Sequence, residues 1–245
     1  MNDFLMDAHM HFDLYRNRED VLSYIEAHRS YTIAVTNLPD LYERYYRQYE
    51  DYKYIRIALG FHPELAYQYR NQLPAFLRYL DSTRFVGEIG LDFNIQDKEN
   101  QSAQKFIFTE IVDACKKSSD KILSVHSRCA ETDCISILNG YKGKVIFHWY
   151  SGSLHTLRDA IDLGCYFSIN QQMLLGKNGR AIVDELPLER ILIESDAPFS
   201  KGLENKYSFL FAEKVYDYLS EKKNIPRSEI PHIIKENFRA LLIDK

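Results

Sequence analysis

The chain has 245 residues, with 31 Lys and Arg against 35 Asp and Glu, which gives a formal net charge of −4. Hydrophobic residues make up 45% and charged residues 27%, a balance that excludes a disordered chain. The slight negative charge argues against a protein that coats DNA, since such proteins need a strongly basic surface. It does not exclude a nuclease, because bound metal ions can supply positive charge at a site.

No apolar run in the sequence is long enough to span a membrane, and residues 1–7 lack the features of a signal peptide. Four cysteines, at positions 115, 129, 134 and 165, form no CxxC pair. We therefore expect a cytoplasmic protein with reduced thiols and no membrane partner.

Short runs rich in β-branched and aromatic residues alternate with longer stretches of helical spacing along the whole chain. Eight runs are predicted strands: 4–9, 31–36, 54–59, 84–88, 121–126, 144–148, 165–169 and 190–194. Because the connections between them are usually long enough for a helix, the strands are expected to run parallel. Eight such units in about 250 residues are typical of a (β/α)₈ TIM barrel. An open, doubly wound sheet is the alternative.

Helical spacing is clear over 101–117, where Phe106, Ile107, Ile111 and Ala114 are expected to face inward. Residues 204–245 are predicted to form two helices with a break near Ile225 and Pro226. No linker rich in Gly, Pro or Ser divides the chain, so we expect a single barrel domain over residues 1–245.

Polar residues gather where the predicted strands end, which is the side of a barrel that carries the active site. Histidines and carboxylates stand at these ends: His9, His11, His62, Glu88, His126, His148 and Asp196. One such histidine is commonly a packing residue, and an isolated H-x-H pair is weak evidence for a metal. Glu88 is harder to explain in that way, because an unpaired carboxylate in an apolar run is costly to bury.

This set of residues suits metal binding. His9 and His11 are two positions apart on a strand, so both side chains project to one face and can bind one ion. Imidazole with carboxylate and no thiolate fits Zn, Mn, Co, Ni or Fe. We expect the bound ions to be divalent, from the set Zn, Mn, Mg, Co and Ni. We expect two such ions, with His9, His11 and Asp196 on the first, His126 and His148 on the second, and Glu88 bridging them.

Several of these residues stand in motifs that resemble the TatD family of metal-dependent deoxyribonucleases, one of the amidohydrolase-like barrels. The matching segments are 7–11 (DAHMH), 60–63 (GFHP), 86–92 (VGEIGLD), 126–128 (HSR), 148–152 (HWYSG) and 194–198 (ESDAP). They follow the order of the family over nearly the whole chain, and the GEIGLD and DAP blocks are the specific ones.

The resemblance implies hydrolysis of DNA phosphodiester bonds, often from single-stranded ends, at a two-metal site with the six ligands named above. Asp196 is then the expected proton acceptor for the attacking water, and Glu88 acts with it in catalysis. His62 and Arg128 are candidates for holding phosphate, Arg128 through charge-assisted hydrogen bonds. Trp149 is expected either to stack on a nucleobase or to pack beneath the rim.

The sequence departs from the family after the DAP block, where residues 199–206 (FSKGLENK) replace the usual proline and Arg-Asn-Glu-Pro-like loop. Compact, divergent members also resemble the QatD component of anti-phage defence operons, which implies protein partners from such an operon. Two rival functions stay open. One is an amidohydrolase or lactonase acting on a small substrate, since fold does not fix function. The other is a catalytically silent barrel subunit of a multiprotein complex.

Overall fold

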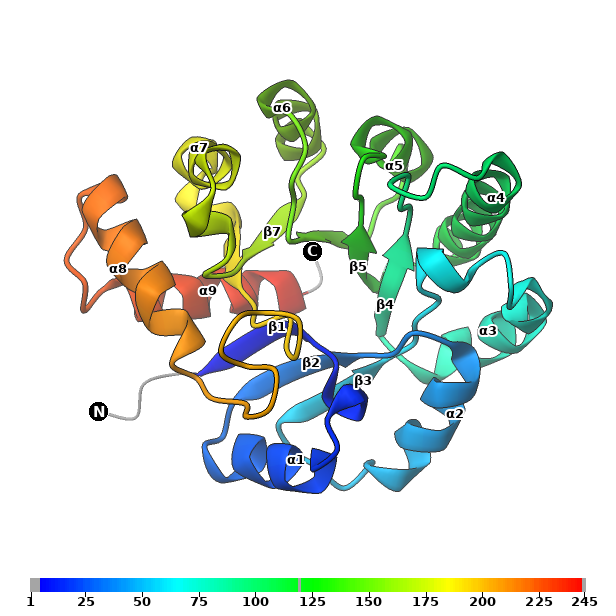
Figure 1. Ribbon diagram of the computed structural model, residues 1–245, viewed down its shortest axis with the longest axis horizontal. Coiled ribbons are helices and arrows are strands. Elements are labelled where there is room, and N and C mark those ends of the chain that lie inside the picture. Colours follow the sequence, from blue (N-terminus) through cyan, green and yellow to red (C-terminus); the bar gives the residue numbers. More distant parts are fainter. Residues whose placement is uncertain (1–4, 119, 244–245) are drawn as a thin grey trace. The chain divides into compact units, whose positions relative to one another are not determined.

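The computed structural model describes residues 5–118 and 120–243. Strands and helices alternate through this part of the chain (Figure 1). The strands are β1 (Met6–Met10), β2 (Tyr31–Val35), β3 (Ile55–Ala58), β4 (Phe85–Gly90), β5 (Ile122–His126), β6 (Lys144–His148), β7 (Tyr166–Ile169) and β8 (Ile191–Ile193). All eight predicted strands are confirmed, with ends that agree to within two residues and with both ends of β6 as predicted. The predicted first residue, Phe4, lies outside the described residues.

Helices follow most of the strands. They are α1 (Arg18–Ala27), α2 (Pro39–Gln48), α3 (Leu73–Tyr79), α4 (Lys98–Cys115), α5 (Glu131–Leu138), α6 (Leu154–Asp162), α7 (Lys177–Glu185), α8 (Phe211–Lys223) and α9 (Ile230–Leu242). The two C-terminal helices confirm the predicted pair with a break near Pro226. No described helix combines the length and the apolar character needed to cross a membrane.

The chain divides into two compact units, each built from segments that are far apart in sequence. The first contains residues 1–34, 51–56 and 166–245, and the second contains residues 35–50 and 57–165. The expectation of a single domain over residues 1–245 stays a prediction.

In the first unit, β1 pairs in parallel with β2, and β7 pairs in parallel with β8. Two backbone hydrogen bonds join the end of β1 to the segment after β8: Asp196 donates to His9 over 3.0 Å, and His11 donates to Ala197 over 2.8 Å. Helix α9 lies against β8 and is anchored there by buried Asn237, whose side-chain amide donates to the carbonyl of Ile191 over 2.8 Å.

In the second unit, β4, β5 and β6 form a parallel sheet, with β5 in the middle. Every residue of β4 is buried, as parallel strands covered on both faces require. Helices α4 and α5 run along one side of this sheet (Figure 1). Parallel pairing brings the carboxyl ends of the three strands to one edge, where Glu88, His126 and His148 stand.

Helix α4 shows one error of the sequence prediction. Ile107 and Ile111 are buried as expected, and Ala114 is half-buried, but the side chain of Phe106 is 59% exposed. The buried face of the helix continues instead through Phe108 and Val112. Successive helical residues point about 100° apart, so Phe106 and the pair Ile107 and Phe108 cannot all face the core.

Candidate functional site

Three candidate ligands meet in the first unit, at the ends of β1 and β8. The Nε2 atoms of His9 and His11 lie 3.3 Å apart, and each lies 3.7 Å from Oδ1 of Asp196. All three side chains are buried. They are close enough to share one cation, and we call them the His9 cluster.

The spacing within the His9 cluster fits a metal ion. Ligand atoms at 2.0–2.1 Å from a tetrahedral zinc stand about 3.4 Å from one another. Two imidazoles and a carboxylate are the donor types that first-row divalent metals accept. The backbone of Asp196 has a φ of 45°, in the left-handed region that non-glycine residues rarely adopt and that functional positions often do.

Asp7 holds the backbone segments that carry the His9 cluster. It is fully buried at the start of the D-x-H-x-H motif, and its Oδ1 accepts hydrogen bonds from the backbone N–H groups of Ser195 (2.9 Å) and His9 (3.2 Å). Its Oδ2 accepts a hydrogen bond from the hydroxyl of Tyr207 over 2.7 Å. Burial raises the pKa of Asp7 to about 6, although these hydrogen bonds oppose the rise. The carboxylate therefore ties β1 to the segment that carries Asp196.

A second group of ligands converges on Glu88 in the second unit. Oε1 of Glu88 lies 2.7 Å from Nδ1 of His126, 2.8 Å from Nε2 of His148 and 3.3 Å from Nε2 of His62. Nδ1 of His126 and Nε2 of His148 are 3.2 Å apart. Glu88 and His148 are buried, whereas His62 and His126 are half-buried. We call these four residues the Glu88 cluster.

Asp92 orients one member of the Glu88 cluster. Its Oδ2 lies 2.9 Å from Nε2 of His126, while Nδ1 of the same ring faces Glu88. Burial lowers the pKa of His126, but the hydrogen bonds and charges of Asp92 and Glu88 outweigh it and raise the pKa to about 10. For Asp92, burial raises the pKa, and the hydrogen bond to His126 leads the effects that bring it below its ordinary value. Carboxylate, imidazole and metal in a row are a common arrangement at metal sites.

Gly90 explains why the ends of β4 and β5 can approach so closely. Its φ is +133°, and a Cβ at this position would lie 2.0 Å from the carbonyl oxygen of His126. That carbonyl accepts a hydrogen bond from the N–H of Leu91 over 2.9 Å, and the N–H of Phe93 donates to the carbonyl of Arg128 over 2.9 Å. Only glycine allows this close contact, which brings Asp92 to His126.

The remaining predicted site residues lie beside the Glu88 cluster in sequence. Arg128 is exposed, and its positive charge contributes to the low pKa of Asp92. Trp149 is half-buried directly after His148, with a φ of 38° in the left-handed region. Their roles in holding phosphate and stacking on a base stay predictions.

The family model described as TatD related DNase matches residues 6–243. The chain belongs to this family. An uncharacterized metal-dependent hydrolase of Buchnera aphidicola, BU355, is 31% identical over 97% of this chain and 98% of its own length. The human deoxyribonuclease TATDN3 is 25% identical over 95% of this chain and 92% of its own length.

Solved structures of the TatD family agree with the chain in fold. The crystal structure of YJJV, a TatD homolog from Escherichia coli K12, matches with a TM-score of 0.84 and 23% identity, and the match covers 98% of each chain. This likeness confirms the predicted fold, a (β/α)₈ TIM barrel. The chain is thus a metal-dependent hydrolase of the TatD family.

Three residues that support the candidate ligands, Asp7, Asp92 and Tyr207, were not predicted as site residues from the sequence. Asp7 and Asp92 stand inside the matched motifs, so their motif positions were a usable signal, although neither lies at a position expected to bind metal. Tyr207 is 200 residues away from its partner Asp7 in sequence, and no local pattern indicates that pairing. His28, His155 and His232 are exposed.

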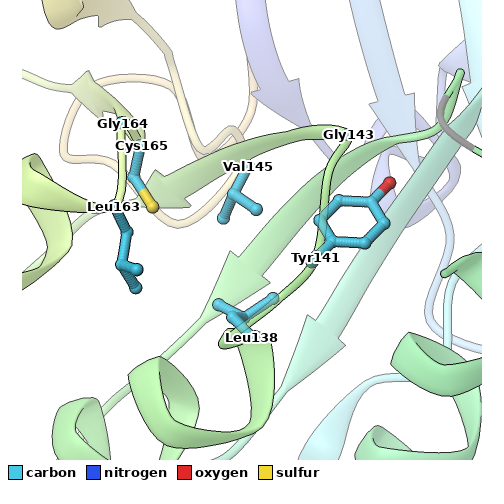
Figure 2. Close-up of a pocket in the computed structure, with 7 residues that line it drawn as sticks. All are labelled: Leu138, Tyr141, Gly143, Val145, Leu163, Gly164 and Cys165. Carbon is cyan, nitrogen blue, oxygen red and sulfur yellow. The ribbon is translucent and has the colours of Figure 1, made fainter.

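A pocket in the second unit does not coincide with the Glu88 cluster. It lies between Tyr141, Val145, Leu163 and Cys165 (Figure 2). Val145 is near the start of β6, whereas His148 is its last residue, so the pocket is at the opposite end of this strand. None of its lining residues carries a carboxylate or an imidazole. It has no part in the proposed chemistry.

Proposed function

We propose that this chain hydrolyses phosphodiester bonds of DNA, acting as an exonuclease at single-stranded ends with two divalent metal ions. The convergence of His9, His11 and Asp196 within 3.7 Å of one another is the observation that carries the proposal. Membership of the TatD-related DNase family, and the name of the human relative, support DNA as the substrate.

The metal ions are assigned to the two clusters. His9, His11 and Asp196 would hold one ion, and His126, His148 and Glu88 would hold the other. A divalent ion bound there lowers the pKa of water and stabilises the charge that develops on a phosphoryl group. Bridging of both ions by Glu88 stays a prediction, as does the choice among Zn, Mn, Mg, Co and Ni.

The chain's own residues then have separate tasks. Asp196 accepts the proton of the attacking water, and Asp7 holds the backbone beside it in place. Asp92 keeps the imidazole of His126 in one orientation. His62 and Arg128 are assigned to the phosphate of the substrate, since both carry donors that suit phosphate oxygens.

The proposal is tested by a substrate panel. Chelator-treated protein is reloaded with each candidate metal and incubated with single-stranded DNA, duplex DNA, RNA, and a set of small amides and lactones. We expect metal-dependent release of nucleotides from single-stranded DNA labelled at one end, and a comparison of both labelled ends gives the polarity. Turnover confined to amides or lactones would favour the small-substrate hydrolase. No turnover of any substrate would favour the silent subunit.

A role in anti-phage defence, with partner proteins from a QatD-type operon, is the more specific part of this proposal, and it rests on the resemblance alone. The test is phage plating on cells that carry the whole operon with either the wild-type chain or Asp196→Asn. We expect protection to be lost with the variant. Full protection with Asp196→Asn would separate any defence role from hydrolysis.

A further inference from the structure

Phe199 is an exposed aromatic residue beside the His9 cluster. Its side chain is 58% exposed, and its ring contacts the ring of His11 edge to face, with centroids 5.3 Å apart and an interplanar angle of 83°. Exposure alone means little, since single exposed apolar residues are common. The position next to a candidate metal ligand is what distinguishes Phe199.

The backbone holds Phe199 in place. Its N–H donates to the carbonyl of Asp196 over 2.8 Å, which closes a turn, and the carbonyl of Ala197 accepts from the N–H of His11 over 2.8 Å. Further along the loop, buried Leu203 accepts a hydrogen bond from the hydroxyl of Tyr15. The ring of Phe199 therefore lies on a loop that is anchored at both ends. This anchoring reduces the conformational entropy that the loop loses when a ligand binds.

The same loop also carries charged side chains, two lysines and Glu204, whose carboxylate accepts a hydrogen bond from the N–H of Gly202 over 2.8 Å. Lys201 and Lys206 are both exposed, and the carbonyl of Lys201 accepts a hydrogen bond from the side-chain amide of Gln171 over 2.9 Å. An aromatic side chain and cationic side chains on one loop are a combination that single-strand binding sites use, because bases stack on the ring while phosphates face the charges.

We propose that Phe199 is a specificity residue that stacks on the base of the nucleotide whose phosphate lies at the His9 cluster. The inference rests on the proposed function, since it needs a nucleic-acid substrate. The placement of Phe199 beside the His9 cluster fits a nucleotide, because one sugar separates the base of a nucleotide from its phosphate.

The test uses two single-stranded oligonucleotides of one sequence, one complete and one without the base of the terminal nucleotide, made for each end. Phe199→Leu removes the aromatic face but keeps apolar bulk, and Phe199→Trp enlarges the face. Phe106→Leu is the matched control, because Phe106 is 59% exposed and lies on α4 of the other unit. kcat/KM and the metal content per chain are measured for every variant.

We expect the wild-type protein to prefer the complete strand over the abasic strand by about 5-fold to about 150-fold, the range of base–aromatic stacking. Phe199→Leu should lose most of this preference with little change on the abasic strand. Phe199→Trp should keep it, and Phe106→Leu should behave as wild type. A terminal 2-aminopurine should be quenched on rapid mixing with the wild-type protein and less so with Phe199→Leu.

Four results would overturn the inference. Equal slowing of both strands by Phe199→Leu, or loss of bound metal, would make Phe199 a positioning residue for His11. An unchanged preference in Phe199→Leu would show that the base is recognised elsewhere. A wild-type protein that cleaves neither strand would refute the proposed function itself, and the inference would fall with it.

Discussion

The carboxylate of Asp92 lies 2.9 Å from Nε2 of His126. The other nitrogen of this ring faces Glu88 at 2.7 Å, so His126 stands between two carboxylates that fix its orientation. A ring fixed in this way presents Nδ1 to an ion without having to reorient, and its basicity as a ligand is increased.

Asp92→Asn should therefore weaken metal binding without removing a proposed ligand. We expect one bound ion to dissociate 10- to 100-fold more readily, the usual cost of losing such a supporting carboxylate, measured by competition with a chelator. Asp97→Asn is the control, because Asp97 caps α4 through Asn100 and asparagine caps equally well. Wild-type metal affinity in Asp92→Asn would show that Asp92 has no part in holding His126.

Tyr207→Phe should lower the stability of the first unit. The substitution removes a 2.7 Å hydrogen bond to the buried carboxylate of Asp7, at an expected cost of about 1–3 kcal/mol in the free energy of unfolding. The matched control is Tyr218→Phe, which removes a 2.8 Å hydrogen bond to exposed Asp184 and should cost no more than about 0.5 kcal/mol. Urea denaturation measures both. Equal losses in the two variants would contradict the assigned role of Asp7.

The two faces of α4 should respond differently to truncation. Ile107 is 2% exposed, so Ile107→Ala should cost about 2–5 kcal/mol in the free energy of unfolding. Phe106→Ala should change it by no more than about 0.5 kcal/mol, because most of the side chain is in solvent. The comparison is made by urea denaturation. A larger loss of stability in Phe106→Ala than in Ile107→Ala would show that the buried face of α4 is assigned wrongly.

That helix also shows how far sequence reasoning reaches. The strands could be predicted because parallel strands are buried on both faces, so runs such as residues 144–148 stand out. The candidate ligands could be predicted because such strands all present their carboxyl ends to one side. Phe106 was misplaced because three consecutive apolar residues leave the inward face of a helix ambiguous. The pairing of Tyr207 with Asp7 depends on tertiary structure, which local patterns do not encode.

Because of the buried thiol of Cys115, the free energy of unfolding should fall as the pH rises into the alkaline range. Burial raises the pKa of this thiol to about 12 from its ordinary 9.0. The pKa of the thiol is higher in the folded protein than in the unfolded chain. The protonated thiol of Cys115 therefore contributes fully to the free energy of unfolding below pH 9, and this contribution is lost as the pH rises towards 12.

Between pH 8 and pH 10 we expect the thiol of Cys115 to account for a fall of roughly 1 kcal/mol in the free energy of unfolding. Cys115→Ala should show a correspondingly shallower decline over this range in urea denaturation. Cys129→Ala removes an exposed thiol and serves as the control. Parallel declines in the wild type and Cys115→Ala would be inconsistent with burial of a protonated thiol.

The central claim is that buried ligands at the strand ends make this chain a metal-dependent DNase. The most direct measurement is the digestion of end-labelled single-stranded DNA by metal-loaded wild-type protein and by folded Asp196→Asn, with and without a chelator. We predict that the wild type degrades the strand, that the chelator stops it, and that Asp196→Asn is at least about 100-fold slower. Degradation that survives the chelator, or that proceeds at the wild-type rate in Asp196→Asn, would contradict the claim.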